Sequence, residues 1–164
     1  MAYLITNTTI GMQPIAETST TQNHPLGTIV NATDGTYGAG EFIYLLGVAS
    51  TAVGSWVTYN LDNGGTALLA ANAIGPVGVA MSANVASSYG WYQISGKAVG
   101  KALASYADNG LVFATATDGS VDDAVVDGDM VHLAKGASAV DTPSTGLAEF
   151  ELSRPYTDDI ATND

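Results

Sequence analysis

Short apolar runs separated by glycine, asparagine and aspartate constrain the fold of this chain more than any other feature. From Leu26 onward, no helical pattern of the length that a parallel crossover needs lies between the runs. Strands are expected over residues 28–30, 41–48, 56–61, 77–81, 89–102, 111–117, 130–134 and 147–153. Many short strands with turn residues between them are typical of sandwiches and small barrels. The sequence therefore predicts an all-β fold, a compact antiparallel β-barrel or β-sandwich.

The alternation of side chains within residues 41–48 predicts a central strand. Phe42 and Tyr44 share one face of this run. Ile43 and Leu45 share the other face. Because both faces are apolar, we expect a strand that other elements cover on both sides.

Other runs carry different local signals. Residues 147–153 alternate apolar with acidic side chains, which predicts a half-buried strand. Within residues 89–102, Gly96 and Gly100 predict a bulge or a sharp bend. Residues 68–73 are alanine-rich and ambiguous, and strand or irregular structure is favoured there over a helical turn.

The composition also divides the chain. Residues 1–25 are rich in threonine and asparagine without sustained periodicity, so we expect an extended N-terminal arm that lies over a neighbouring surface or is loosely ordered. Residues 26–155 are expected to form a single β-domain, and residues 156–164 a C-terminal tail. The start of the chain lacks the pattern of a signal peptide, and no apolar run reaches the length of a membrane span.

Charge and composition narrow the classes of partner. Only 12% of the residues are charged, and the net charge is −12. Such a protein repels phosphate backbones and anionic lipid surfaces, so we expect neither nucleic acid nor a membrane as a partner. The chain has no cysteine, which excludes disulfides and thiolate chemistry.

Residues capable of catalysis are scarce. His24 lies in the expected arm and His132 within an expected strand, and neither is near a serine in a Gly-x-Ser-x-Gly context. No recognisable spacing places two acids on facing strands, so an acidic hydrolase has the least support among the alternatives. We expect no enzyme activity, no catalytic residue and no cofactor.

An acidic stretch over residues 118–129 partly matches a calcium-binding loop. Loop positions 1, 3, 5 and 12 fall on Asp118, Ser120, Asp122 and Asp129. Asp123 replaces the glycine at position 6, and a shorter aspartate replaces the glutamate at position 12. A solvated acidic connection is therefore expected, with no metal site.

Two tryptophans stand among neutral polar residues. The candidate interface residues are Trp56, Thr58, Asn60, Trp91, Gln93 and Ser95. Tryptophan surrounded by uncharged polar side chains is typical of the centre of a protein–protein interface. The alternative is that both rings cover the open end of the protein's own core.

Several segments resemble the head decoration proteins of tailed bacteriophages, also called capsid cement proteins. They are GEFIYL at 40–45, VASTAVGSWVTY at 48–59, GPVGVAM at 75–81, YGWYQISGKA at 89–98, DTPS at 141–144 and AEF at 148–150. The resemblance covers roughly residues 26–155 and implies a compact β-structure that clamps the outer face of an assembled shell. The partners that it implies are the major capsid protein and further copies of the chain, with a homotrimer favoured and a dimer next.

The implied location is the outer surface of the virion head, after a stage in the host cytoplasm during assembly. The alternative from another class is a carbohydrate- or receptor-binding β-module of the virion surface. In that alternative Trp56, Trp91 and Tyr92 would serve as platforms on which sugars stack.

Overall fold

The protein is all-β. The structure, a computed structural model, describes residues 3–6 and 11–161, and this part of the chain contains no helix. Its strands are β1 (Leu4–Ile5), β2 (Ile29–Asp34), β3 (Gly38–Leu46), β4 (Trp56–Tyr59), β5 (Thr66–Leu68), β6 (Gly75–Ala80), β7 (Tyr89–Lys101), β8 (Phe113–Ala114), β9 (Val121–Asp122), β10 (His132–Gly136) and β11 (Leu147–Thr157). Neighbouring strands pair antiparallel throughout, so the predicted fold class and pairing are confirmed.

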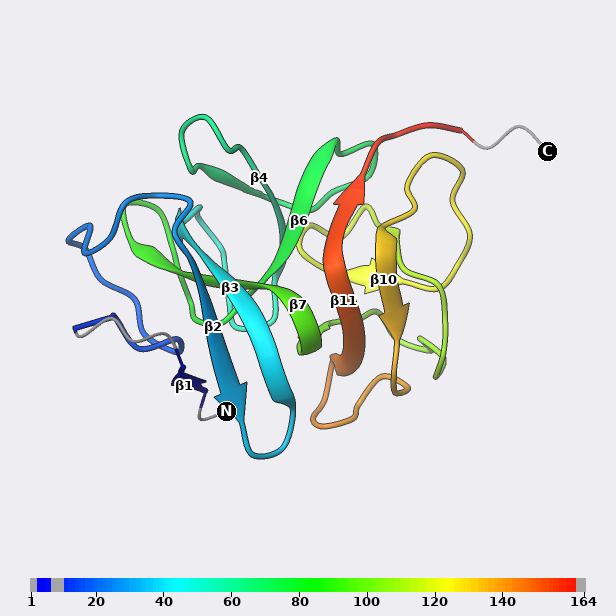
Figure 1. Ribbon diagram of the computed structural model, residues 1–164. Coiled ribbons are helices and arrows are strands. Elements are labelled where there is room, and N and C mark those ends of the chain that lie inside the picture. The colour runs from blue at the N-terminus through cyan, green and yellow to red at the C-terminus, as the bar shows by residue number, and fades with distance from the viewer. Residues whose placement is uncertain (1–2, 7–10, 162–164) are drawn as a thin grey trace.

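The main sheet is curled into a half-barrel rather than flat (Figure 1). Its order is β1-β2-β3-β7-β11-β6-β4-β5, with β10 added to the free side of β11 and β8–β9 as a separate pair. The curl follows because β6 pairs with both β7 and β11. At the far end, Leu46 N–H of β3 donates to the carbonyl of Gly64, just before β5, at 2.9 Å.

A bulge in β7 re-aims this strand from one partner to another. Its first half pairs with β3 and its second half with β11, and the β3–β7 register shifts between Glu41 and Phe42. Gly96 lies beside the shift with φ +93°, and a Cβ there would overlap the carbonyl oxygen of Ala39. The predicted bend near Gly96 is therefore confirmed, and it depends on the absence of a side chain.

The apolar side chains form three clusters around the curled sheet. The N-terminal core contains Tyr3, Ile15, Val30, Ala32, Phe42, Tyr44, Met81 and Trp91. The central core contains Ile43, Leu45, Val57, Ala80, Tyr92 and Ile94. The C-terminal core includes Trp56, Val77, Val79, Ala98, Tyr106, Ala148, Phe150 and Leu152. The prediction that β3 is covered on both faces is confirmed, because its alternate residues enter the N-terminal and central cores.

An extended N-terminal arm is not supported. Residues 11–25 pack on the sheet to the side of β2 in Figure 1, and Ser19 forms a β-bridge with Tyr89 at the start of β7. Ile15 is 2% exposed and closes the N-terminal core. The polar composition of this segment did not predict its burial, because its buried polar groups form hydrogen bonds with the sheet. Residues 1–2 and 7–10 of the expected arm lie outside the described residues.

The chain end also departs from expectation. The last strand continues past residue 155, and Tyr156 and Thr157 pair with Pro76 and Gly75 of β6. Within β11, Ala148, Phe150 and Leu152 point inward, as the alternation predicts. Residues 162–164 of the expected tail lie outside the described residues.

Candidate functional site

Both tryptophans lie inside the protein, together with Gln93. Trp91 is 0% exposed, and its Nε1 donates to the backbone oxygen of Gln13 at 2.9 Å. Trp56 is equally buried and packs edge-on against Phe150 with ring centroids 4.9 Å apart. The Gln93 amide donates to the carbonyls of Ser95 and of residue 97, at 3.0 and 3.2 Å. The rings therefore belong to the protein's own cores, which is the alternative that the sequence left open.

The same burial bears on the carbohydrate-binding alternative. Tyr92 is 0% exposed and lies in the central core. Stacking of a sugar needs an aromatic face open to solvent. None of the three proposed platforms, Trp56, Trp91 and Tyr92, presents such a face.

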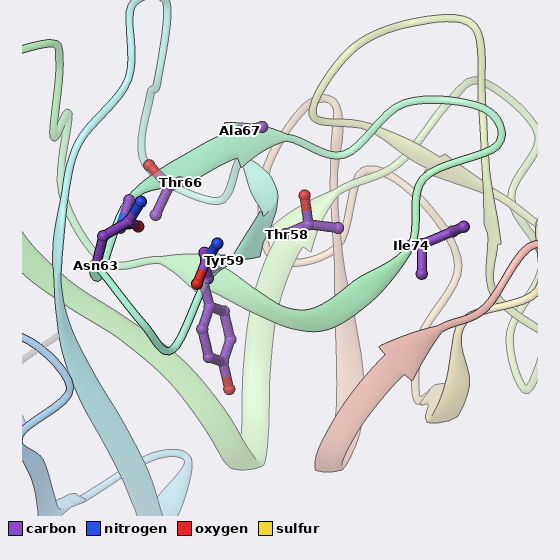
Figure 2. A pocket seen from close by; sticks show the side chains of 8 residues that line it. Thr58, Tyr59, Asn63, Thr66, Ala67 and Ile74 are labelled. Carbon is purple, nitrogen blue, oxygen red and sulfur yellow. The ribbon is translucent and has the colours of Figure 1, made fainter.

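The remaining predicted residues lie at two separate places. Thr58 and Asn60 line an open pocket of about 350 Å³ on the β4–β5 hairpin, with Ile74 at its edge (Figure 2). Ser95 lies elsewhere, beside Glu41 in a second pocket of about 230 Å³. The structure therefore does not bring the six candidate interface residues together.

The hairpin pocket is lined by polar groups that are already engaged in local hydrogen bonds. The Asn60 Oδ1 accepts from the N–H of residue 62 at 2.7 Å, and the Asn63 Oδ1 accepts from Gly65 N–H at 2.9 Å. Figure 2 shows the Tyr59 ring pointing away from the Thr58 hydroxyl, and burial raises the pKa of this tyrosine. These contacts hold the turn and engage the side-chain oxygens of Asn60 and Asn63 within the chain.

A different surface combines exposed apolar side chains. We call it the apolar pocket, and its volume is about 200 Å³. It is lined by Leu111, Phe113, Val125, Val126, Asp127, Gly128, Met130, His132 and Ile160. In Figure 1 the segment after β11 passes beside the loop between β9 and β10, which brings the end of the described chain into the pocket wall.

Contacts around His132 position this wall. Its ring stacks on Tyr156, its cross-strand partner, with centroids 4.9 Å apart and an interplanar angle of 20°. The His132 Nε2 lies 3.4 Å from Asp158 Oδ1, which also accepts the backbone N–H of Ile160 at 3.2 Å. His132 therefore links the edge strand β10 to the segment after β11.

The residues that line the apolar pocket share no local sequence pattern. Its members come from segments that only the sheet topology brings together, so no local pattern could show that they meet. One signal was available in Val125 and Val126, two adjacent apolar residues within an otherwise acidic and turn-rich stretch. Consecutive valines outside a strand predict either an unrecognised core contact or an exposed contact surface.

The acids of residues 118–129 serve separate backbone contacts. Asp123 Oδ2 accepts the N–H of Ala107 at 3.0 Å, and Asp129 Oδ1 accepts the N–H of Asn72. Within residues 3–6 and 11–161, no group of three or more histidine, aspartate or glutamate side chains is arranged to hold a metal ion. These aspartates act as turn and loop caps.

Two of the four basic side chains are paired with acids away from the apolar pocket. Lys97 pairs with Glu149, and this hydrogen bond raises the pKa of the lysine. Arg154 donates to both carboxylate oxygens of Glu41, at 2.9 and 3.2 Å. The hydrogen bond from Arg154 lowers the pKa of Glu41.

No protein-family model, curated protein or solved structure matches the chain. In the part of the chain that the structure describes, there is no helix long and apolar enough to cross a membrane.

Proposed function

We propose that this chain is a structural protein of a bacteriophage virion that binds the outer surface of the assembled head and stabilises the capsid lattice. The observation that carries the proposal is the apolar pocket, whose aliphatic side chains are exposed and available for contact with another protein. Exposed apolar side chains gathered at one place mark protein interaction sites. The resemblance of residues 26–155 to decoration proteins and their curled antiparallel sheet support the same proposal.

The proposed mechanism is selective binding. A protein that binds only the expanded lattice stabilises that lattice, by an amount that grows with its concentration and affinity. Many copies on one shell, or copies joined as a trimer or a dimer, gain avidity over a single contact. The net charge of −12 keeps such a protein away from the packaged nucleic acid.

The test uses expanded capsids that lack their decoration protein. The purified chain is added, binding is measured by co-sedimentation, and the melting temperature of the capsid is measured by calorimetry. We expect saturable binding to the expanded capsids and a higher melting temperature. Capsids that melt at the same temperature with and without the chain would contradict the proposal, as would equal binding to unexpanded shells.

A further inference from the structure

The apolar pocket gathers several exposed aliphatic side chains at one place. Its open wall is formed by Leu111 at 48% exposure, Val125 at 77%, Val126 at 44% and Ile160 at 65%. Its floor is the buried ring of Phe113, which is 4% exposed. A dry cavity of about 150 Å³ accommodates benzene, so the pocket volume of about 200 Å³ accommodates one aromatic or branched side chain.

The rim of the apolar pocket is acidic. Asp127 is part of its lining, and the carboxylate of Asp159 lies against the backbone of Gly128, another lining residue. Asp158 lies 3.4 Å from the Nε2 of His132, a third lining residue. Neither lysine nor arginine is among the lining residues. A partner would therefore meet an apolar centre with negative charge beside it.

We propose that the apolar pocket receives one large apolar side chain from a segment of another protein that carries lysine or arginine beside that side chain. The apolar group supplies the buried contact, and the flanking cations match the acidic rim. The proposal rests on the proposed function, in which this segment belongs to the shell protein, and it names the chemistry by which that protein is recognised.

Charge argues against a second copy of the chain as the occupant. Each copy carries a net charge of −12 and only four basic residues. Two of these, Lys97 and Arg154, are engaged with glutamates of their own chain. A second copy would bring further acids to an acidic rim, and like charges brought together disfavour association.

The first experiment tests recognition without capsids. The full chain, labelled at its isoleucine, leucine and valine methyl groups, is titrated with the capped peptide Lys-Lys-Phe-Lys-Lys while NMR shifts are followed. Control peptides carry serine in place of phenylalanine, or glutamate in place of lysine. We expect shifts at the methyl groups of Val125, Val126 and Ile160, with binding about tenfold weaker for each control.

Three outcomes of this titration overturn the inference. They are the absence of shifts at these methyl groups, equal shifts with the serine peptide, and equal shifts with the glutamate peptide. A fourth outcome, concentration-dependent shifts of the same methyl groups without peptide, assigns the pocket to a second copy and also overturns it.

The second experiment separates this inference from the proposed function. Val125→Ser and the matched control Leu61→Ser remove side chains that are 77% and 71% exposed, so neither change disturbs a core. We expect Val125→Ser to weaken binding to expanded capsids about tenfold and Leu61→Ser to leave it unchanged. If the two variants bind like the unmodified chain, the inference fails and the proposed function stands. If the unmodified chain does not bind capsids, the proposed function fails, and the peptide titration alone decides whether the pocket has the stated chemistry.

Discussion

Gln13 joins the N-terminal segment to the sheet through a fully satisfied set of hydrogen bonds. Its side-chain oxygen accepts from Tyr44 Oη at 2.8 Å and from Asn23 Nδ2 at 2.9 Å. Its side-chain nitrogen donates to the carbonyls of Glu17 and Tyr89, at 2.8 and 3.1 Å. A buried glutamine with all these partners is a strong local determinant of structure.

Removal of this side chain is expected to destabilise the fold. Gln13→Ala leaves the Tyr44 hydroxyl proton without its acceptor, whereas the Tyr89 carbonyl still accepts the N–H of Ser19. A buried group left unpaired costs about 1–3 kcal/mol, and we expect the free energy of unfolding, measured by urea titration, to fall by that amount. The control is Gln22→Ala, which removes an exposed hydrogen bond to the carbonyl of His24. Equal stabilities of the two variants would contradict this prediction.

Gly100 lies against the indole of Trp56. A Cβ at this position would lie 2.6 Å from Trp56 Nε1, and the ring cannot withdraw because it packs against Phe150. Overpacking of this kind typically costs about 1–3 kcal/mol, so Gly100→Ala is expected to lower the free energy of unfolding by that amount. At Gly35 a Cβ meets nothing within 4 Å, so Gly35→Ala is the control and is expected to be nearly neutral. A Gly100→Ala variant as stable as the control would show that the indole moves freely.

At the scale of elements, one ion pair links two strands that do not pair with each other. Glu41 belongs to β3 and Arg154 to β11, and β7 lies between these strands. The hydrogen bond from Arg154 lowers the pKa of Glu41 below its ordinary value of 4.5. A carboxyl whose pKa is lowered by folding stabilises the fold at pH values above the pKa that it has in the unfolded chain. This stabilisation is lost as the pH falls through the lower pKa of the folded state.

Removal of the guanidinium should therefore be visible as a change in titration. In Arg154→Gln we expect the pKa of Glu41, measured by carbon NMR of its carboxyl group, to rise towards 4.5. Lys135→Gln removes the same charge from β10 and is expected to leave that pKa unchanged. Because the pair is exposed, the effect on stability is small. An unchanged Glu41 titration in Arg154→Gln would rule out the pair in solution.

The positions of the longer strands could be predicted from the sequence, but the burial of the polar face of β7 could not. The alternation in β3 and β11 is a local property, and it predicted which side chains enter the cores. Gln93 and its neighbours follow the same polar alternation as a solvent-facing strand. The burial of this face depends on a distant part of the chain, because Trp91 packs with Ile15 and donates to the Gln13 carbonyl, and Gln93 hydrogen-bonds with Tyr3.

The candidate site was beyond prediction for the same physical reason. The apolar pocket needs β8, the β9–β10 loop and the segment after β11 to meet, and periodicity within one segment carries no information on such contacts. The location of the two tryptophans could not be predicted, because a large apolar residue among polar ones gives the same sequence pattern at an interface and beneath a covering segment of the same chain. Only the tertiary structure separates these two cases.

At the scale of the whole molecule, each core holds a tyrosine whose pKa burial raises. These residues are Tyr3 in the N-terminal core, Tyr92 in the central core and Tyr106 in the C-terminal core. Burial raises the pKa of Tyr3 from 10.0 to about 12.

The raised pKa values predict an alkaline limit to stability. Below the unfolded pKa of 10.0 all these tyrosines are neutral in both states, so their contribution to stability is constant. As the pH rises above that value, the unfolded chain loses phenolic protons that the folded chain retains, and the free energy of unfolding falls. We expect tyrosinate absorbance to rise together with loss of the tryptophan fluorescence of the native state.

The variant Tyr3→Phe has one fewer buried tyrosine, and its free energy of unfolding is expected to fall less steeply with pH. Complete tyrosinate formation near pH 10 with native fluorescence retained would mean that these rings titrate as if exposed, and would contradict the three-core packing.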